Sequence, residues 1–374
     1  MDIRLDSVLN LFKPSRIAIP IIIGLSAALF LVYQTFDLEA YQKINWHYGM
    51  ALWLFLSVMM MVVRDLAYMY RIRVLTEKKI SWRNSFDVIM LWEFASSVTP
   101  SIVGGTAAAF FILTKEKIKA GKTTAIVLTT AFLDELFFIT AAPLLFLLVG
   151  FDNILPGLDT DMEATFFYGR SIFVIFLIGY GILFVYTLFL AYGLFWNPRG
   201  LKWLIVRFTS IKWLRKWRDD AIKIGNDVIV TSNELAQKNW GFWLKAFGAT
   251  VASWSSRFIM VNLLIMAFIN VDEHFYIYAR QVIMWIILLI TPTPGGSGMA
   301  EFIFPAFFST FLPVGIAASV AFLWRTLSYY PYLFIGAIVL PNWIKRVFHA
   351  EQKLGAKTKK RENINPSKPN SNQK

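Results

Sequence analysis

Long apolar stretches, separated by short charged segments, fill most of the chain. A helix needs about 20 mostly apolar residues to cross the hydrocarbon core of a bilayer. Stretches of this kind lie at residues 17–33, 46–70, 123–149, 170–195, 240–268 and 314–340. The sequence therefore predicts an all-α polytopic membrane protein with six full spans. We expect residues 1–345 to form the integral membrane domain and 346–374 to form a basic, disordered cytoplasmic tail.

Two further apolar segments, residues 84–114 and 275–312, are interrupted by proline and glycine. The first contains Thr99-Pro-Ser-Ile-Val-Gly-Gly105, and the second contains Thr291-Pro-Thr-Pro-Gly-Gly-Ser-Gly-Met-Ala-Glu301. Proline and adjacent glycines break a continuous helix. Broken backbone at membrane depth is tolerated only where protein or a water-filled cavity satisfies its polar groups. We predict two re-entrant broken hairpins, whose second half-helices begin at Thr106 and at Ser297 or Gly298. A turn at the membrane surface is the alternative.

Positively charged residues gather in alternate connections between the apolar stretches. Basic residues dominate the N-terminal segment, the connections 71–83, 115–122 and 198–239, and the segment after Lys345. The 150–168 connection is acidic, with Asp152, Asp159, Asp161 and Glu163 and no basic residue. The positive-inside rule then places both termini in the cytoplasm. With six spans, the two hairpins enter the membrane from opposite sides.

Charges and breaks recur at similar spacing in two parts of the chain. Arg64 precedes Pro100 by 36 residues, and Arg257 precedes Pro292 by 35. Asp134 follows Pro100 by 34 residues, and Arg325 follows Pro292 by 33. Together with the opposite entry of the hairpins, this spacing indicates an inverted-topology repeat, an arrangement typical of transporters. Its halves are 46–149 and 240–340.

The connection between the halves, residues 200–238, is too charged to span the membrane. Leu201, Leu204, Ile205 and Phe208 recur at helical spacing among tryptophan, lysine and arginine residues. This pattern is typical of an amphipathic helix in the cytoplasmic interface. A soluble linker helix packed on the protein is an equally compatible interpretation.

The amino-acid composition excludes several kinds of chemistry for this protein. The net charge of +13 agrees with basic cytoplasmic loops. Outside these loops the sequence lacks the patterned basic and aromatic residues that would indicate nucleic-acid binding. The lack of cysteine excludes disulfides, thiol catalysis and cysteine-bound metals. His47, His274 and His349 show no ligand spacing, so we expect neither a metal nor another cofactor. Asp134 and Glu135 would point about 100° apart on a helix and so make a poor acid/base pair. We expect a protein that is not an enzyme.

Ionisable residues inside the spans and breaks are the candidate functional groups, because each costs about 2.5–3.5 kcal/mol to insert. An arginine guanidinium suits bidentate binding of phosphate or carboxylate, and half-helix N-termini add positive dipole ends. We predict an anion-binding cavity at mid-membrane. Its charged residues would be Arg257, Arg325, Glu301, Asp134 and Glu135. Its residues in the breaks would be Thr99, Gly104, Gly105, Thr293, Gly295, Gly296 and Ser297. Ion pairs among the charged residues are the alternative.

Three motifs follow one another in the second half of the chain. They are Pro292-Thr-Pro-Gly-Gly-Ser-Gly-Met-Ala-Glu301, Trp324-Arg325-Thr-Leu-Ser-Tyr-Tyr330-Pro and Leu333-Phe-Ile-Gly336. Their series resembles the membrane region of the lysylphosphatidylglycerol synthase/flippase family, which includes stand-alone flippase-like proteins. The resemblance implies flipping or scrambling of a phospholipid or related lipid-linked anion between leaflets of the bacterial cytoplasmic (inner) membrane. In bifunctional members an aminoacyltransferase domain follows the membrane region. Here only the polar segment 346–374 follows, so the resemblance implies a separate lipid-modifying synthase as partner.

Two other functions remain open from the residues alone. A membrane-embedded transferase acting on lipid-linked substrates would need an acid/base pair or metal ligands facing a cavity. A small-solute or ion-coupled secondary transporter is equally compatible with an inverted repeat. A cavity open sideways to lipid would distinguish a lipid transporter from both.

Overall fold

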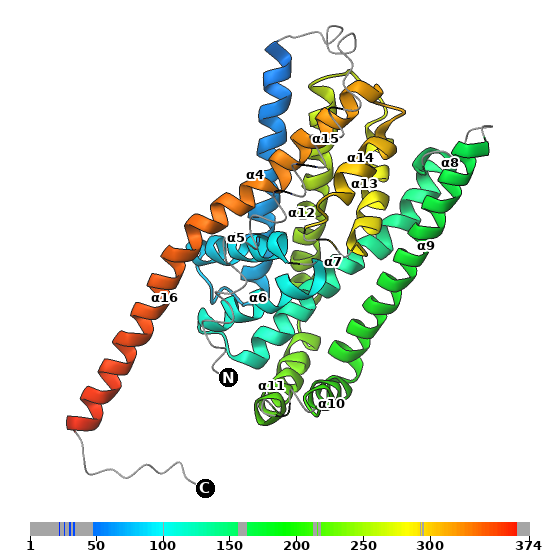
Figure 1. Ribbon diagram of the computed structural model, residues 1–374. Helices are drawn as coiled ribbons and strands as arrows, with labels where there is room; N and C mark the ends of the chain where they lie inside the picture. Colours follow the sequence, from blue (N-terminus) through cyan, green and yellow to red (C-terminus); the bar gives the residue numbers. More distant parts are fainter. Residues whose placement is uncertain are drawn as a thin grey trace.

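The computed structural model describes residues 48–99, 101–155, 163–211, 215, 218–291, 293 and 295–364, together with Ile22, Ser26, Phe30 and Tyr33. Every regular element in these residues is a helix (Figure 1). The predicted span 17–33 lies outside them apart from those four positions. The first helices are α4 (Tyr48–Leu75), α5 (Trp82–Val98), α6 (Ser101–Lys115), α7 (Ala120–Val149), α8 (Phe151–Ile154) and α9 (Glu163–Ala191), which continues into a π-helical turn, η2 (Tyr192–Trp196). The others are α10 (Pro198–Phe208), α11 (Arg218–Ala236), α12 (Trp240–Met266), α13 (His274–Leu289), α14 (Met299–Phe308), α15 (Val314–Ser328) and α16 (Tyr330–Ile364).

Several helices are long and apolar enough to cross a membrane. They are Tyr48–Leu75, Ala120–Val149, Ser171–Trp196 and Trp240–Met266. These coincide with the predicted spans 46–70, 123–149, 170–195 and 240–268. Apolar side chains point outward from them, as contact with lipid requires; α9, for example, exposes Val185 and Leu188. The protein is therefore an all-helical, membrane-embedded protein.

The predicted span 314–340 is not one continuous helix. α15 ends at Ser328 and α16 begins at Tyr330, with Tyr329 between them at φ −129° and ψ −58°. Pro331 explains the break, because proline inside a helix lacks an amide hydrogen and clashes with the carbonyl four residues earlier. A helix that begins at Tyr330 holds Pro331 in its first turn, where neither penalty applies.

Both interrupted segments contain two helices with a break between them. In the first, α5 ends at Val98 and α6 begins at Ser101, so the predicted start at Thr106 is wrong. Gly104 and Gly105 lie inside α6. Gly105 permits close packing instead, because a Cβ there would lie 2.2 Å from Ser96 Oγ on α5. Packing thus overrides the low helix propensity of the glycine pair. In the second segment, α14 begins at Met299, just after the predicted start.

The two halves of the chain share one core. α4 and α12, the first long helix of each half, pack along each other, and α7 contacts α9, α11, α12 and α13. α16 crosses α5, and its last part extends away from the bundle (Figure 1). Aromatic rings fill the centre between α7 and α12, where Trp254 lies edge-on to Phe138 and stacks on Phe258.

Residues 200–238 form two helices, α10 and α11, rather than one. α11 packs on α7 and on α10, which agrees with the interpretation of a linker packed on the protein. α10 buries Leu201 but leaves Trp203 and Phe208 each 64% exposed. An exposed aromatic face is also what contact with the membrane interface requires, so that contact stays a prediction.

A cluster of ion pairs links the ends of α4, α7 and α12. Glu77, in the turn after α4, lies 2.6 Å from Lys122 Nζ and 3.1 Å from Lys238 Nζ. Hydrogen bonds from Lys122 and then Lys238 lower the pKa of Glu77 to about 2. Because the pKa of Glu77 is depressed in the folded state, the cluster stabilises the fold above the ordinary glutamate pKa. This stabilisation is lost as pH falls toward 2. The Glu77 side chain is 41% exposed, so the contribution of this cluster to stability is small.

The last helix extends into the segment predicted to be a disordered tail. α16 continues to Ile364, whereas residues 365–374 lie outside the described part of the chain. The sequence from Lys345 to Lys360 contains five lysines and two alanines, which are good helix formers. Helix propensity thus extends the element past the apolar segment that anchors it.

We predict that Gly336→Ala destabilises the protein by about 1–3 kcal/mol, the usual cost of overpacking a core. A Cβ at Gly336, on α16, would lie 2.3 Å from Phe94 Cβ and Cγ on α5. Gly181→Ala on α9 is the matched control, since a Cβ there meets nothing within 4 Å. Thermal unfolding in detergent measures both; equal midpoints would contradict the close packing of α16 on α5.

Candidate functional site

A cavity of about 270 Å³ lies between the two halves of the chain. Its walls come from α4 to α7 and α9 on one side, and from α12 to α15 with the 290–298 break on the other. The predicted site residues among its walls are Gly105, Asp134, Glu135, Arg257, Gly295, Gly296 and Arg325. Thr99, Thr293, Ser297 and Glu301 are not among its walls, and Gly104 lies in the first turn of α6. The structure thus brings together residues from both interrupted segments and from the long helices of both halves.

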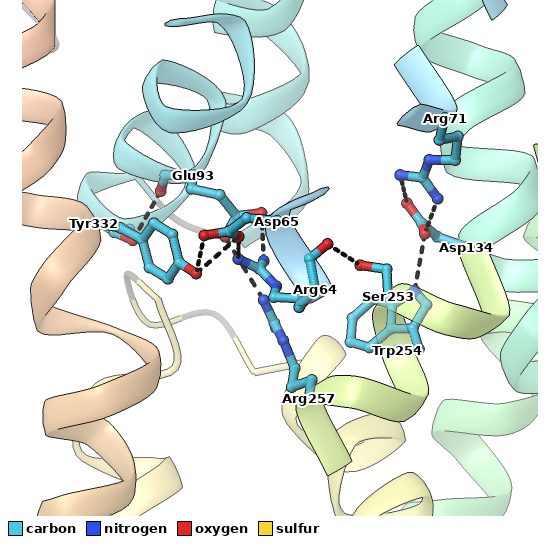
Figure 2. Close-up of polar contacts among 10 residues, drawn as sticks. Arg64, Asp65, Arg71, Glu93, Asp134, Ser253, Trp254, Arg257 and Tyr332 are labelled. Atoms are coloured by element: carbon cyan, nitrogen blue, oxygen red, sulfur yellow. Dashed lines mark hydrogen bonds and ion pairs between the residues drawn. The ribbon is translucent and has the colours of Figure 1, made fainter. Parts of the chain in front are cut away.

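A cluster of paired charges lies beside the cavity where α4, α5 and α12 meet (Figure 2). Arg64 is fully buried, with Nη1 2.8 Å from Asp65 and Nη2 2.6 Å from Glu93. Tyr332 donates its hydroxyl to Asp65 at 2.9 Å. Arg257 approaches the same Glu93 from α12, with Nη2 at 3.7 Å. Arg64 and Arg257, the two arginines at equivalent places in the predicted repeat, therefore share one carboxylate.

A second pair joins α4 to α7. Arg71 Nη1 and Nη2 donate to the two Asp134 oxygens at 2.5 and 3.1 Å, and Trp254 Nε1 donates to Asp134 at 2.9 Å (Figure 2). The sequence assigned Arg71 to a charged loop, but α4 continues to Leu75 and leaves Arg71 only 4% exposed. Asp134 lines the cavity with its carboxylate already engaged, which agrees with the ion-pair alternative for this residue.

A third pair closes the second break. Arg325 Nε donates to Glu301 at 3.0 Å, and Arg325 Nη2 donates to the Gly295 carbonyl at 3.0 Å. The other Glu301 oxygen accepts the amide hydrogen of Gly298 at 2.8 Å, at the N-terminus of α14. Glu301 therefore occupies the place at this helix N-terminus that the sequence assigned to a bound anion. Arg325 and Glu301 are 3% and 0% exposed, and their geometry also agrees with the ion-pair alternative.

The glycines of this break are required by its backbone. Gly295, Gly296 and Gly298 have φ values of 57°, 70° and 85°, in the left-handed region that favours glycine. A Cβ at Gly295 would also lie 2.3 Å from the ring of Tyr329. The glycine cluster thus allows the chain to turn sharply directly beneath an aromatic ring.

Tyr329 connects the breaks of the two halves. Its hydroxyl donates to the Ser97 carbonyl at the end of α5, at 2.9 Å, and accepts from Ser297 Oγ at 3.3 Å. Its ring lies 3.9 Å from the Arg325 guanidinium carbon. The predicted site residues include neither Tyr329 nor Arg71. Pro331 was an available signal for the break at Tyr329, whereas only the fold reveals the partner of Arg71.

Two ionisable residues on the cavity wall, Arg257 and Glu135, have unused hydrogen-bonding capacity, as do the neutral side chains of Thr130 and Trp285. Arg257 Nε is buried with no hydrogen-bond partner among the described residues, and its guanidinium carbon lies over the rings of Trp254 and Trp285, 5.0 and 4.9 Å from their centres. Glu135 Oε2 is likewise buried and without a partner in the described part of the chain. An unsatisfied buried polar group costs about 1–3 kcal/mol, so its retention requires an explanation. Both residues line the cavity, the space that a ligand would occupy.

The described residues include no evident metal-binding site. They hold no group of three or more histidine, aspartate or glutamate side chains arranged to bind a metal ion. The groups that the cavity wall offers to a ligand include the Arg257 guanidinium, the Glu135 carboxyl group and the rings of Trp254 and Trp285.

We predict that Arg325→Ala unfolds or strongly destabilises the protein, by about 3–5 kcal/mol, because it leaves Glu301 buried without its counter-charge. The double variant Arg325→Met with Glu301→Gln should recover much of this loss, since it removes both charges and keeps an acceptor for Gly298. Thermal unfolding of Arg325→Met, Glu301→Gln and the double variant measures the coupling between the two side chains. Additive losses would show that the two side chains do not stabilise each other.

Comparison with known proteins agrees with this architecture. A protein of Archaeoglobus fulgidus described as a UPF0104 membrane protein is 26% identical over 278 residues, which cover 70% of this chain and 76% of the relative. No solved structure matches the chain significantly. The family model for the lysylphosphatidylglycerol synthase TM region matches residues 17–336, which confirms the resemblance found in the sequence. The chain belongs to the lysylphosphatidylglycerol synthase transmembrane-region family.

Proposed function

We propose that the protein moves a phospholipid, or a related lipid-linked anion, between the leaflets of the membrane. The observation that carries this proposal is Arg257, a buried arginine on a cavity wall with an N–H group that no described protein atom satisfies. A phosphate oxygen is the acceptor that best suits such a guanidinium.

The local charges support Arg257 rather than Arg325 as the group that holds the phosphate. Arg325 is closed in by Glu301, the Gly295 carbonyl and the ring of Tyr329. Arg257 has one carboxylate at 3.7 Å, and that carboxylate, Glu93, is held more closely by Arg64 at 2.6 Å. Loss of Arg257 therefore leaves no unpaired carboxylate behind.

Glu135 supplies a second contact of opposite character. Its free oxygen would accept a hydrogen bond from a hydroxyl or ammonium group of the headgroup, while Arg257 holds the phosphate. The walls thus favour a phospholipid whose headgroup carries both an anion and a donor. Trp254 and Trp285 restrict the guanidinium and reduce the conformational freedom lost on binding.

The order of elements supports the inverted repeat as part of this proposal. Each half has a long helix, two helices separated by a break, and a further helical segment containing Asp134 or Arg325. The cavity lies where the breaks meet, as in transporters that expose one site alternately to the two sides. We extend the proposal to six spans with the two hairpins re-entering from opposite sides.

The setting of this activity follows from the charge pattern and the family. We place the protein in a cytoplasmic membrane with both termini in the cytoplasm, where the basic connections lie. Its partners would be the transported lipid and, in the same membrane, a separate synthase that modifies the lipid. The competing transport of a small solute is tested by the same experiment.

We predict that Arg257→Gln lowers lipid translocation about tenfold or more, the loss expected for one charge-assisted hydrogen bond. Fluorescent phosphatidylglycerol and phosphatidylethanolamine in reconstituted vesicles report translocation. The translocation rate of Arg257→Lys, which keeps the charge but not the planar guanidinium, should lie between those of the wild type and Arg257→Gln.

Arg83→Gln, an exposed position on α5, is the matched control for the change in charge. Circular dichroism and thermal unfolding check that each variant is folded. Equal translocation by the Arg257 and Arg83 variants would contradict the assigned role of Arg257. A wild-type protein that moves neither lipid would favour a solute instead.

A further inference from the structure

A second hollow, of about 390 Å³, lies beside the central cavity. α6 and α9 each pack on α7, and the hollow lies between them over α7, so we name it the α6–α9 groove. Its walls include Ala107 and Phe110 of α6, Leu128 of α7 and Tyr186 of α9. No charged side chain is among its walls.

The groove adjoins the central cavity. Thr106, Val127 and Tyr186 line both spaces. The cavity carries the charged groups, including Arg257 and Glu135, whereas the groove is apolar apart from hydroxyl groups. Polar and apolar compartments therefore meet along one shared wall.

We propose that the α6–α9 groove is the lateral entrance of the site and holds a hydrocarbon chain of the lipid whose headgroup lies in the central cavity. This inference rests on the proposed function and specifies its substrate as a molecule with at least one long apolar chain. The headgroup crosses the membrane among the polar groups of the cavity, and the chain stays in the groove and in the surrounding lipid.

The membrane surroundings explain why a lipid chain occupies the groove. α9 forms one side of it, and α9 exposes apolar side chains such as Val185 and Phe189 along its length. Ala107, on the opposite side, is exposed and small. A groove on helices that contact lipid fills with hydrocarbon, because water at that depth would find few hydrogen-bonding partners. A free solute would gain nothing from such an opening.

Photolabelling of the full chain in vesicles tests the inference without measuring transport. The probe is phosphatidylglycerol with a photoreactive diazirine in its acyl chain, and mass spectrometry compares label in peptides that contain 106–110 and 124–128 with label at Leu147. Leu147, on α7, is 84% exposed and reports contact with bulk lipid. In the wild type we expect strong groove labelling that falls about tenfold, relative to Leu147, in Arg257→Gln, because the headgroup anchor is lost.

A blocking variant tests the route itself. Ala107→Trp fills the groove from its exposed side and should abolish both groove labelling and lipid translocation, whereas Leu147→Trp should leave both unchanged. Thermal unfolding confirms that each variant is folded. Groove labelling that does not depend on Arg257, or wild-type translocation by Ala107→Trp, would overturn the inference and leave the proposed function intact. Arg257-dependent labelling by a protein that moves no lipid would support the lipid site and contradict the flipping activity.

Discussion

The pairing of charges away from water is the constraint on which the rest of this structure depends. A single unpaired charge in such surroundings costs several kcal/mol, so each charge needs a partner that the fold brings from elsewhere in the chain. The pairs are Arg64 with Asp65 and Glu93, Arg71 with Asp134, and Arg325 with Glu301. Together they join α4 to α5 and α7, and they join α15 to the N-terminus of α14. The charged residues that define the site therefore also fix the helices around it.

This pairing also identifies the groups that are free for function. Once the pairs are formed, Arg257 retains an unsatisfied donor and Glu135 an unsatisfied oxygen on the walls of one cavity. The breaks in the helices also shape the site, because they bring glycine backbone and Tyr329 to the cavity wall. In the proposed function, the adjoining α6–α9 groove gives the polar site a path toward lipid. A charged site for the headgroup and an apolar path for the chain are the two features that a lipid transporter requires.

Sequence reasoning predicted the parts of this architecture that depend on local pattern. Apolar length predicted the spans at α4, α7, α9 and α12, and proline with glycine predicted the two interrupted segments. Charges in apolar surroundings singled out Asp134, Glu301 and Arg325, but did not predict which ion pairs they form. Arg71 resembles any other basic residue near the end of a span, and its partner Asp134 lies 63 positions away. The engagement of Arg325 by Glu301 and the position of Tyr329 between the breaks likewise depend on tertiary contacts, which spacing along the chain does not specify.

An experimental structure of the full chain in nanodiscs that contain phosphatidylglycerol would test the central claim most directly. The account predicts a lipid phosphate within hydrogen-bonding distance of the Arg257 guanidinium, with an acyl chain that leaves the cavity between α6 and α9. The ion pairs of Arg71 with Asp134 and of Arg325 with Glu301 should be unchanged. An Arg257 fully hydrogen-bonded to protein groups, with no lipid headgroup in the cavity, would contradict it.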